Sequence, residues 1–233
     1  MKFFVTAILL LLAPALWANE GVHLDKANVN LHDQAALQRG AKHFFGYCSG
    51  CHALKYARYE RIGKDIGLSP DEVKKSLMPA GSKIVDLVTN PMLPEDAEKW
   101  FGTPVPDLTL AARLRGEDWI YSFLRSFYQD PKKVMGVNNR IFPDVAMPHV
   151  LVDLQGLQKA VYHEEKGEAG HAAKTFEKFE KVAPGTLTTE QYDQMVKDIV
   201  TFLTYVSEPI KLERQALGLN VLIFLLIFSV LAY

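Results

Sequence analysis

Two cysteines and a histidine near residue 50 have the types and spacing needed to hold a cofactor. Cys48, Cys51 and His52 form the pattern Cys-x-x-Cys-His, which is the attachment site of c-type haem. Two thiols with this spacing can form thioethers with the two vinyl groups of one porphyrin, and the imidazole that follows then lies beneath the iron as its proximal ligand. The sequence therefore predicts one covalent haem c, with His52 as an iron ligand.

Three other interpretations of this motif are weaker. A thioredoxin-like redox disulfide requires a βαβ pattern around the cysteines, and none is visible. A zinc site would need scattered histidines as further ligands, because the chain has only 2 cysteines. A chance match would not explain the exported N-terminus and the amphipathic segment at residues 37–47 that accompany the motif. We therefore prefer the haem interpretation.

The second axial ligand decides whether the iron has an open position for a gas or peroxide or forms a closed electron-transfer site. Met92 and Met147 are the best candidates, since both stand in proline-rich loops that can hold a weak thioether ligand in place. Spacing favours Met147, and His149 is a rival two residues further on. Met195 fits the apolar face of a helix, where packing explains it.

The composition is that of a folded, exported protein. The chain has 233 residues, 48% of them hydrophobic, and a net charge of −1, which argues for a sizeable core and against a nucleic-acid partner. Lys2 precedes an apolar run at 3–12, and small residues follow it. We predict a signal peptide over residues 1–18, cleaved after Ala18 or alternatively after Ala15, so that the mature chain works outside the cytoplasm. An uncleaved N-terminal membrane anchor is the other interpretation.

The C-terminal block at 217–233 carries no charge. A full membrane span needs about 20 residues, and no lysine or arginine follows the block, so we expect the natural chain to continue past Tyr233. A buried core helix is the alternative, although the block is apolar on every face. We predict a membrane anchor over 210–233 and an extracytoplasmic cytochrome c domain over 19–209.

Helix start signals are frequent in the middle of the chain. Asp33, Ser69 and Thr188 are each suited to cap a helix N-terminus, the last two as capping boxes. Aromatic residues at spacings of four, the last of them Phe127, predict a helix over 117–128.

Proline and glycine predict long loops over 79–106 and 131–148, and alternating strand patterns are scarce. Residues 163–185, within a charged insertion at about 153–188, predict a solvated segment that is part helix. The predicted fold class is mainly α: a c-type cytochrome domain with long loops, plus one C-terminal transmembrane helix.

Four stretches stand in order along the sequence: CSGCHALKYARY at 48–59; PDLT at 106–109 with RLRGEDW at 113–119; NRIFP at 139–143 with AMP at 146–148; and DIVTFL at 198–203 with EP at 208–209. Together they resemble the cytochrome c1 family, the haem subunit of the quinol–cytochrome c oxidoreductase. The Cys-x-x-Cys-His motif alone occurs in many cytochromes, whereas four stretches in order, with a signal and an anchor, are specific.

The resemblance implies roles for five residues. Met147 corresponds to the family's axial methionine, and Arg115 to the arginine that pairs with a haem propionate, which a guanidinium can bind through two hydrogen bonds. Pro106 corresponds to a proline that lies against the haem, and Leu108 and Phe142 correspond to apolar wall positions.

The sequence also departs from the family pattern. Val105 replaces a frequent second proline, and Trp119 stands where tyrosine is common. The segment 142–147 is shorter than in mitochondrial relatives, and the insertion at 153–188 has no counterpart there. These departures indicate a bacterial form.

The resemblance implies a one-electron carrier that is not an enzyme as an isolated chain. Electrons would pass from a Rieske iron–sulfur protein to a c-type cytochrome, beside a cytochrome b subunit in a dimeric complex. The chain would cross the inner (cell) membrane once, with its haem domain on the periplasmic side. The alternatives are a membrane-anchored cytochrome subunit of another respiratory oxidoreductase, a haem enzyme or gas sensor with an open iron, and a structural protein without haem.

Overall fold

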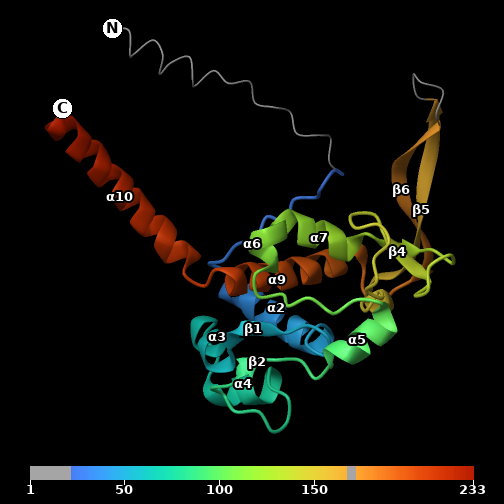
Figure 1. Cartoon of the computed structure of the whole chain (residues 1–233), viewed down its shortest axis with the longest axis horizontal. Coiled ribbons are helices and arrows are strands. Elements are labelled where there is room, and N and C mark those ends of the chain that lie inside the picture. Colours follow the sequence, from blue (N-terminus) through green and yellow to red (C-terminus); the bar gives the residue numbers. More distant parts are fainter. Residues whose placement is uncertain (1–21, 167–171) are drawn as a thin grey trace.

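The computed structural model describes residues 22–166 and 172–233, so the predicted signal peptide lies outside the described part. Helices dominate it, accompanied by two short antiparallel strand pairs and one long one (Figure 1). The helices are α2 (Gln34–Tyr47), α3 (Tyr59–Asp65), α4 (Pro70–Ser76), α5 (Pro94–Phe101), α6 (Ala111–Arg115), α7 (Glu117–Arg125), α8 (Val152–Gln155), α9 (Thr189–Ser207) and α10 (Lys211–Ala232). The strand pairs are β1 (Leu54–Arg58) with β2 (Leu87–Val88), β3 (Phe127–Gln129) with β4 (Val137–Asn139), and β5 (Gly156–Lys166) with β6 (Ala172–Pro184).

The three predicted N-caps each begin a helix. The Asp33 carboxylate accepts a hydrogen bond from the Ala36 N–H at 3.0 Å at the start of α2. Ser69 and Thr188 form complete capping boxes at the starts of α4 and α9. Each cap satisfies backbone donors that a helix leaves without partners at its first turn, so these starts are set by local sequence.

Helices α2 and α9 pack closely in the centre of the domain (Figure 1). Gly40 of α2 lies so near the Asp198 carbonyl of α9 that any side chain there would overlap it. Beside this contact, the Arg39 guanidinium donates to both carboxylate oxygens of Asp198, at 2.7 and 3.0 Å. Phe44 and Phe202 meet in the core below, with ring centroids 5.7 Å apart. This crossing fixes the C-terminal end of α2, from which the Cys-x-x-Cys-His turn follows.

The helix predicted over 117–128 is wrong in its last turn. Helix α7 ends at Arg125, and Phe127 begins strand β3, where it pairs with Asn139 of β4. The side-chain amide of Gln158 donates to the Arg125 and Phe127 carbonyls at 3.0 and 2.7 Å. Pairing with β4 and hydrogen bonds from Gln158 therefore occupy the backbone groups that would have continued the helix. The aromatic spacing of four nevertheless continues through Phe127.

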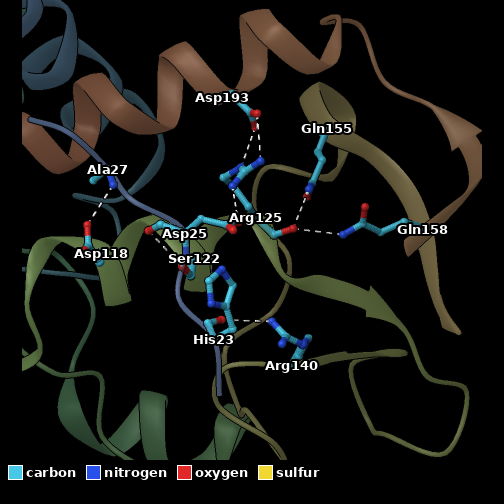
Figure 2. Close-up of polar contacts among 10 residues, drawn as sticks. All are labelled: His23, Asp25, Ala27, Asp118, Ser122, Arg125, Arg140, Gln155, Gln158 and Asp193. Carbon is cyan, nitrogen blue, oxygen red and sulfur yellow. Dashed lines mark hydrogen bonds and ion pairs between the residues drawn. The ribbon is translucent and has the colours of Figure 1, made fainter. Parts of the chain in front are cut away.

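The Arg125 side chain joins three segments that are distant in the sequence (Figure 2). Its guanidinium donates to both carboxylate oxygens of Asp193 in α9, at 2.6 and 2.9 Å, and forms a further ion pair with Asp25. The segment around Asp25 also donates backbone N–H groups to Ser122 and Asp118 on α7, at 2.8 and 2.9 Å. The first described residues are thereby bound along α7 (Figure 2).

The expectation that residues 163–185 are part helix is contradicted, because β5 and β6 form a long hairpin that projects from the domain (Figure 1). The register shifts between Val161 and Tyr162, where β6 contains one extra residue. Phe176 and Phe179 consequently lie on the same face, with ring centroids 4.8 Å apart. A β-bulge thus places these two aromatic residues, three positions apart, on one face of the hairpin.

The C-terminal helix α10 leaves the domain as a separate rod (Figure 1). An 18-residue window of this helix has a mean hydropathy of 2.3, and none of its 22 residues is buried. Among the described residues it is the one helix long and apolar enough to cross a membrane. The alternative of a buried core helix is therefore wrong, and the fold is the predicted mainly helical domain with one membrane-anchor helix.

Candidate haem site

Five of the eight predicted haem-binding residues line one open cavity, whose volume is about 550 Å³ with its opening to solvent included. Both cysteines, His52, Pro106 and Met147 line it, although the motif and Met147 are about a hundred positions apart in the sequence. Its surface is almost entirely apolar, as a porphyrin face requires. The other lining residues are Tyr47, Phe101, Thr103, Pro104, Val105, Ala146, Pro148 and Val150.

The Cys-x-x-Cys-His segment forms a tight turn where α2 ends. The backbone N–H of Cys51 and that of His52 both donate to the Cys48 carbonyl, at 3.1 and 2.8 Å. This turn directs both thiols and the imidazole toward one cavity. The side-chain amide of Asn90 donates to the Cys51 carbonyl, so the loop that contains Met92 supports the turn from outside. Met92 itself does not line the cavity.

The orientation of the His52 ring is set by the backbone opposite. Its Nδ1 lies 2.8 Å from the Pro106 carbonyl oxygen, which can only accept, so Nδ1 is the donor. Nε2 is left unprotonated and available as a metal ligand, because an acceptor on the other ring nitrogen fixes the tautomer of a ligating histidine. Burial lowers the pKa of His52, which favours this neutral form. The Leu108 N–H donates to the Ala53 carbonyl at 3.0 Å and fastens the 106–108 segment to the motif.

Both cysteines are free thiols and form no disulfide with one another. Burial raises the pKa of the Cys48 thiol to about 12, so that it is protonated at neutral pH. Within the described residues, no group of three or more histidine, cysteine and acidic side chains could hold a metal ion. The zinc interpretation therefore has no ligand set here, whereas two thiols, a neutral imidazole, a thioether and apolar walls fit a haem c.

The loop that contains Met147 is held by two buried asparagines of β4. The Asn139 side-chain oxygen accepts from the backbone N–H groups of Ile141 and Phe142, at 2.9 and 3.2 Å. The Asn138 side-chain oxygen accepts from the Asp144 N–H at 2.8 Å. These bonds shape the start of the loop in place of regular secondary structure, so Met147 does not depend on a helix for its position.

His149, the rival ligand, is not in the cavity. Its ring is stacked on Phe127, with centroids 4.8 Å apart and planes inclined by 6°. It is 8% exposed, and burial lowers its pKa to about 4. The ring thus packs against the domain while Met147, two residues earlier, lines the cavity.

Three predicted pocket residues lie outside the cavity walls. The Arg115 guanidinium is 5.1 Å from the Trp119 ring centroid and 6.0 Å from that of Phe142, so cation–π contacts hold it. Phe142 is 44% exposed, and Leu108 packs against the main core. The structure therefore brings Arg115 and Phe142 together beside Trp119, outside the residues that line the cavity.

Sequence reasoning missed most of the apolar wall. Tyr47, Ala146 and Pro148 flank predicted residues directly, so adjacency could have identified them. Phe101 had no such signal, because it ends α5 and reaches the cavity only through the folding of the intervening chain.

Comparison with known proteins places the chain among the bacterial cytochromes. A family profile described as "Cytochrome C1 family" matches residues 25–233. Cytochrome c1 of Allochromatium vinosum is 48% identical, over 100% of this chain and 96% of its own length. A Nitrosomonas europaea protein named "Ammonia monooxygenase gamma subunit" is 44% identical, over 97% of this chain and 91% of its own. Cytochrome c1 of Rhodospirillum rubrum is 29% identical, over 94% and 88%. The chain therefore belongs to the cytochrome c1 family, whose members are electron-transfer subunits with one covalently bound c-type haem.

Proposed function

We propose that this protein carries single electrons from a Rieske iron–sulfur protein to a c-type cytochrome, as the haem subunit of a quinol–cytochrome c oxidoreductase. The observation that carries the proposal is the convergence of Cys48, Cys51, His52 and Met147 in one apolar cavity. An imidazole and a thioether are the axial pair of electron-transfer cytochromes. Family membership supports the same assignment.

The residues of the chain prepare the site for electron transfer. When bound, the haem supplies the one-electron redox couple. Cys48 and Cys51 would hold it covalently, while the Pro106 carbonyl keeps the His52 ring in the ligating tautomer. Met147 would close the remaining axial position to external ligands and favour the ferrous state. The apolar walls exclude water, which further disfavours the charged ferric state.

We further propose that Arg115 binds a haem propionate, with Leu108 and Phe142 as outer apolar wall. Within the described part of the chain, Arg115 makes no ion pair, and the rings of Trp119 and Phe142 hold its guanidinium. A guanidinium held this way presents several N–H donors to a carboxylate.

Replacing Arg115 tests whether its positive charge acts on the haem. Arg115→Leu is expected to lower the midpoint potential, because a positive charge near the iron is lost and the ferric state becomes less unfavourable. We expect a shift below about 59 mV, the equivalent of a tenfold change in a one-electron equilibrium. Arg115→Lys retains the charge and should shift it less. Redox titration of the full-length holoprotein measures the midpoint potentials of both variants. Equal potentials for wild type and Arg115→Leu would show that Arg115 is not part of the haem site.

Helix α10 supports a proposed membrane arrangement. We propose that α10 is a single-pass anchor and that residues 1–18 are a signal peptide. The haem domain then faces the periplasm, and the chain lies beside a cytochrome b subunit in a dimeric complex. Lys211 and Arg214 lie at the domain end of α10, ahead of the uncharged block, where basic side chains can reach the membrane surface.

Isolation from native membranes tests the proposed partners. A tagged chain is expected to co-purify with a cytochrome b and a Rieske protein, and the complex should reduce a c-type cytochrome with quinol. The second candidate is a cytochrome subunit of another oxidoreductase, which the name of the 44% identical relative suggests. Recovery with monooxygenase subunits, and without cytochrome b and Rieske protein, would favour that candidate instead.

A further inference from the structure

We propose that His149 is a positioning residue for Met147: its stacked ring fastens the loop that presents the thioether to the iron. This inference rests on the proposed ligation by His52 and Met147. His149 would act through the loop and would not touch the haem, because its ring lies outside the cavity walls.

The first support is the contact of His149 itself. Its ring lies face to face on Phe127, with centroids 4.8 Å apart and an interplanar angle of 6°. Phe127 is 1% exposed and sits in the β3–β4 ladder opposite Asn139. Because both rings are buried, neither can turn without opening the contact. The stack therefore fixes the backbone two residues after Met147.

The second support is that this stack is the end of a row of rings. Phe127 meets Phe123 edge-to-face at 5.2 Å, and Phe123 is stacked on Trp119 at 5.1 Å with planes inclined by 8°. Trp119 and Phe123 belong to α7, which is packed on α9. His149 thereby connects the ligand loop to the rigid helical core.

The third support is the way in which the loop is held at its other end. Asn138 and Asn139 bind the backbone N–H groups of residues 141, 142 and 144. Between these bonds and His149, Val145 and Met147 pack with Phe127 in a small second core cluster. The backbone around Met147 is therefore held on both sides, by the asparagine hydrogen bonds before it and by the His149 stack after it. A thioether is a weak ligand, so its bond to iron depends on such preorganisation.

Ring-shape variants of the full-length, haem-loaded protein test the proposal. His149→Ala removes the ring, whereas His149→Phe keeps a flat ring for the stack. Leu124→Ala is the matched control, because Leu124 is buried in α7 but belongs to the main core cluster. The readouts are the charge-transfer absorption that a thioether gives to ferric haem, CO binding by the ferrous protein, and the midpoint potential.

We expect His149→Ala to weaken the thioether band, to raise the CO-binding fraction at least tenfold and to lower the potential. His149→Phe should restore all three toward wild type. Leu124→Ala should lower the melting temperature and change none of them. A wild-type band and CO insensitivity in His149→Ala would overturn the proposal, as would equal ligand loss in Leu124→Ala.

A second variant covers the case in which His149→Ala fails to fold. Phe127→Leu keeps apolar volume and removes the ring on which His149 is stacked, so it should weaken the same band. An unchanged band would overturn the proposal. Failure of the proposed function is distinguishable, because a wild-type protein that binds CO or lacks the band would show that Met147 is not a ligand.

Discussion

Replacing Met147 with alanine is expected to open the iron of this protein to external ligands. The variant loses the thioether that shares the cavity with His52, and no other described methionine lines that cavity. Ferrous protein should then bind CO. The midpoint potential should fall by at least about 59 mV, a tenfold shift toward the ferric state, because thioether ligation favours ferrous iron. Reduced-minus-oxidised spectra with and without CO, together with redox titration, measure both effects.

Met92→Ala is the matched control, because Met92 is also in a proline-rich loop but lies outside the cavity walls. We expect its spectrum and potential to equal those of the wild type. A Met147→Ala protein that stays low-spin and insensitive to CO would contradict the proposed ligand. A wild-type protein that itself binds CO would contradict the electron-transfer proposal and favour a ligand-binding or catalytic haem.

Replacing Gly40 with alanine is expected to give the largest loss of stability among small changes. The added Cβ would overlap the Asp198 carbonyl of α9 and lie 2.9 Å from the Phe202 Cβ. Backbone cannot move aside as a side chain can, so α2 and α9 must separate and strain the Arg39–Asp198 pair. Overpacking of this kind costs about 1–3 kcal/mol. Thermal unfolding of the detergent-solubilised holoprotein, followed by far-ultraviolet circular dichroism, measures the loss.

Gly46 provides the control within the same helix. A Cβ at Gly46 meets no atom within 4 Å, so Gly46→Ala should be neutral or stabilising by up to about 1 kcal/mol, from helix propensity alone. If Gly40→Ala melted at the wild-type temperature, the two helices would not cross as closely as the structure shows. Equal losses in both variants would point to a general effect of alanine in α2.

Features that depend on neighbours in the sequence were predictable. The Asp33, Ser69 and Thr188 caps begin helices because each side chain reaches backbone donors within three residues. The Cys-x-x-Cys-His turn likewise brings its own functional groups together. The apolar character of α10 is a property of its composition, so no packing partner was needed to recognise it.

Features that depend on distant partners were predicted wrongly or left open. The helix through Phe127 ends early because β4 and Gln158 take up its backbone groups. The charged segment at 163–185 was predicted to be part helix from its composition, whereas its described residues belong to the paired strands β5 and β6. In both places a long-range pairing overrides a local pattern, and no short window of sequence contains the partner.

The second axial ligand shows most clearly which features the local sequence sets and which depend on the fold. The sequence by itself determined that His52 follows two thiols. Its residues made Met92, Met147 and His149 the candidates for the opposite position, and the family resemblance favoured Met147. Only the tertiary structure decided that Met147 lines the cavity, while His149 turns onto Phe127 and the Met92 loop supports the motif from outside. The physical reason is that a covalent motif is local, whereas the second ligand must reach the same cavity from a loop whose course is set by packing and buried hydrogen bonds elsewhere in the domain.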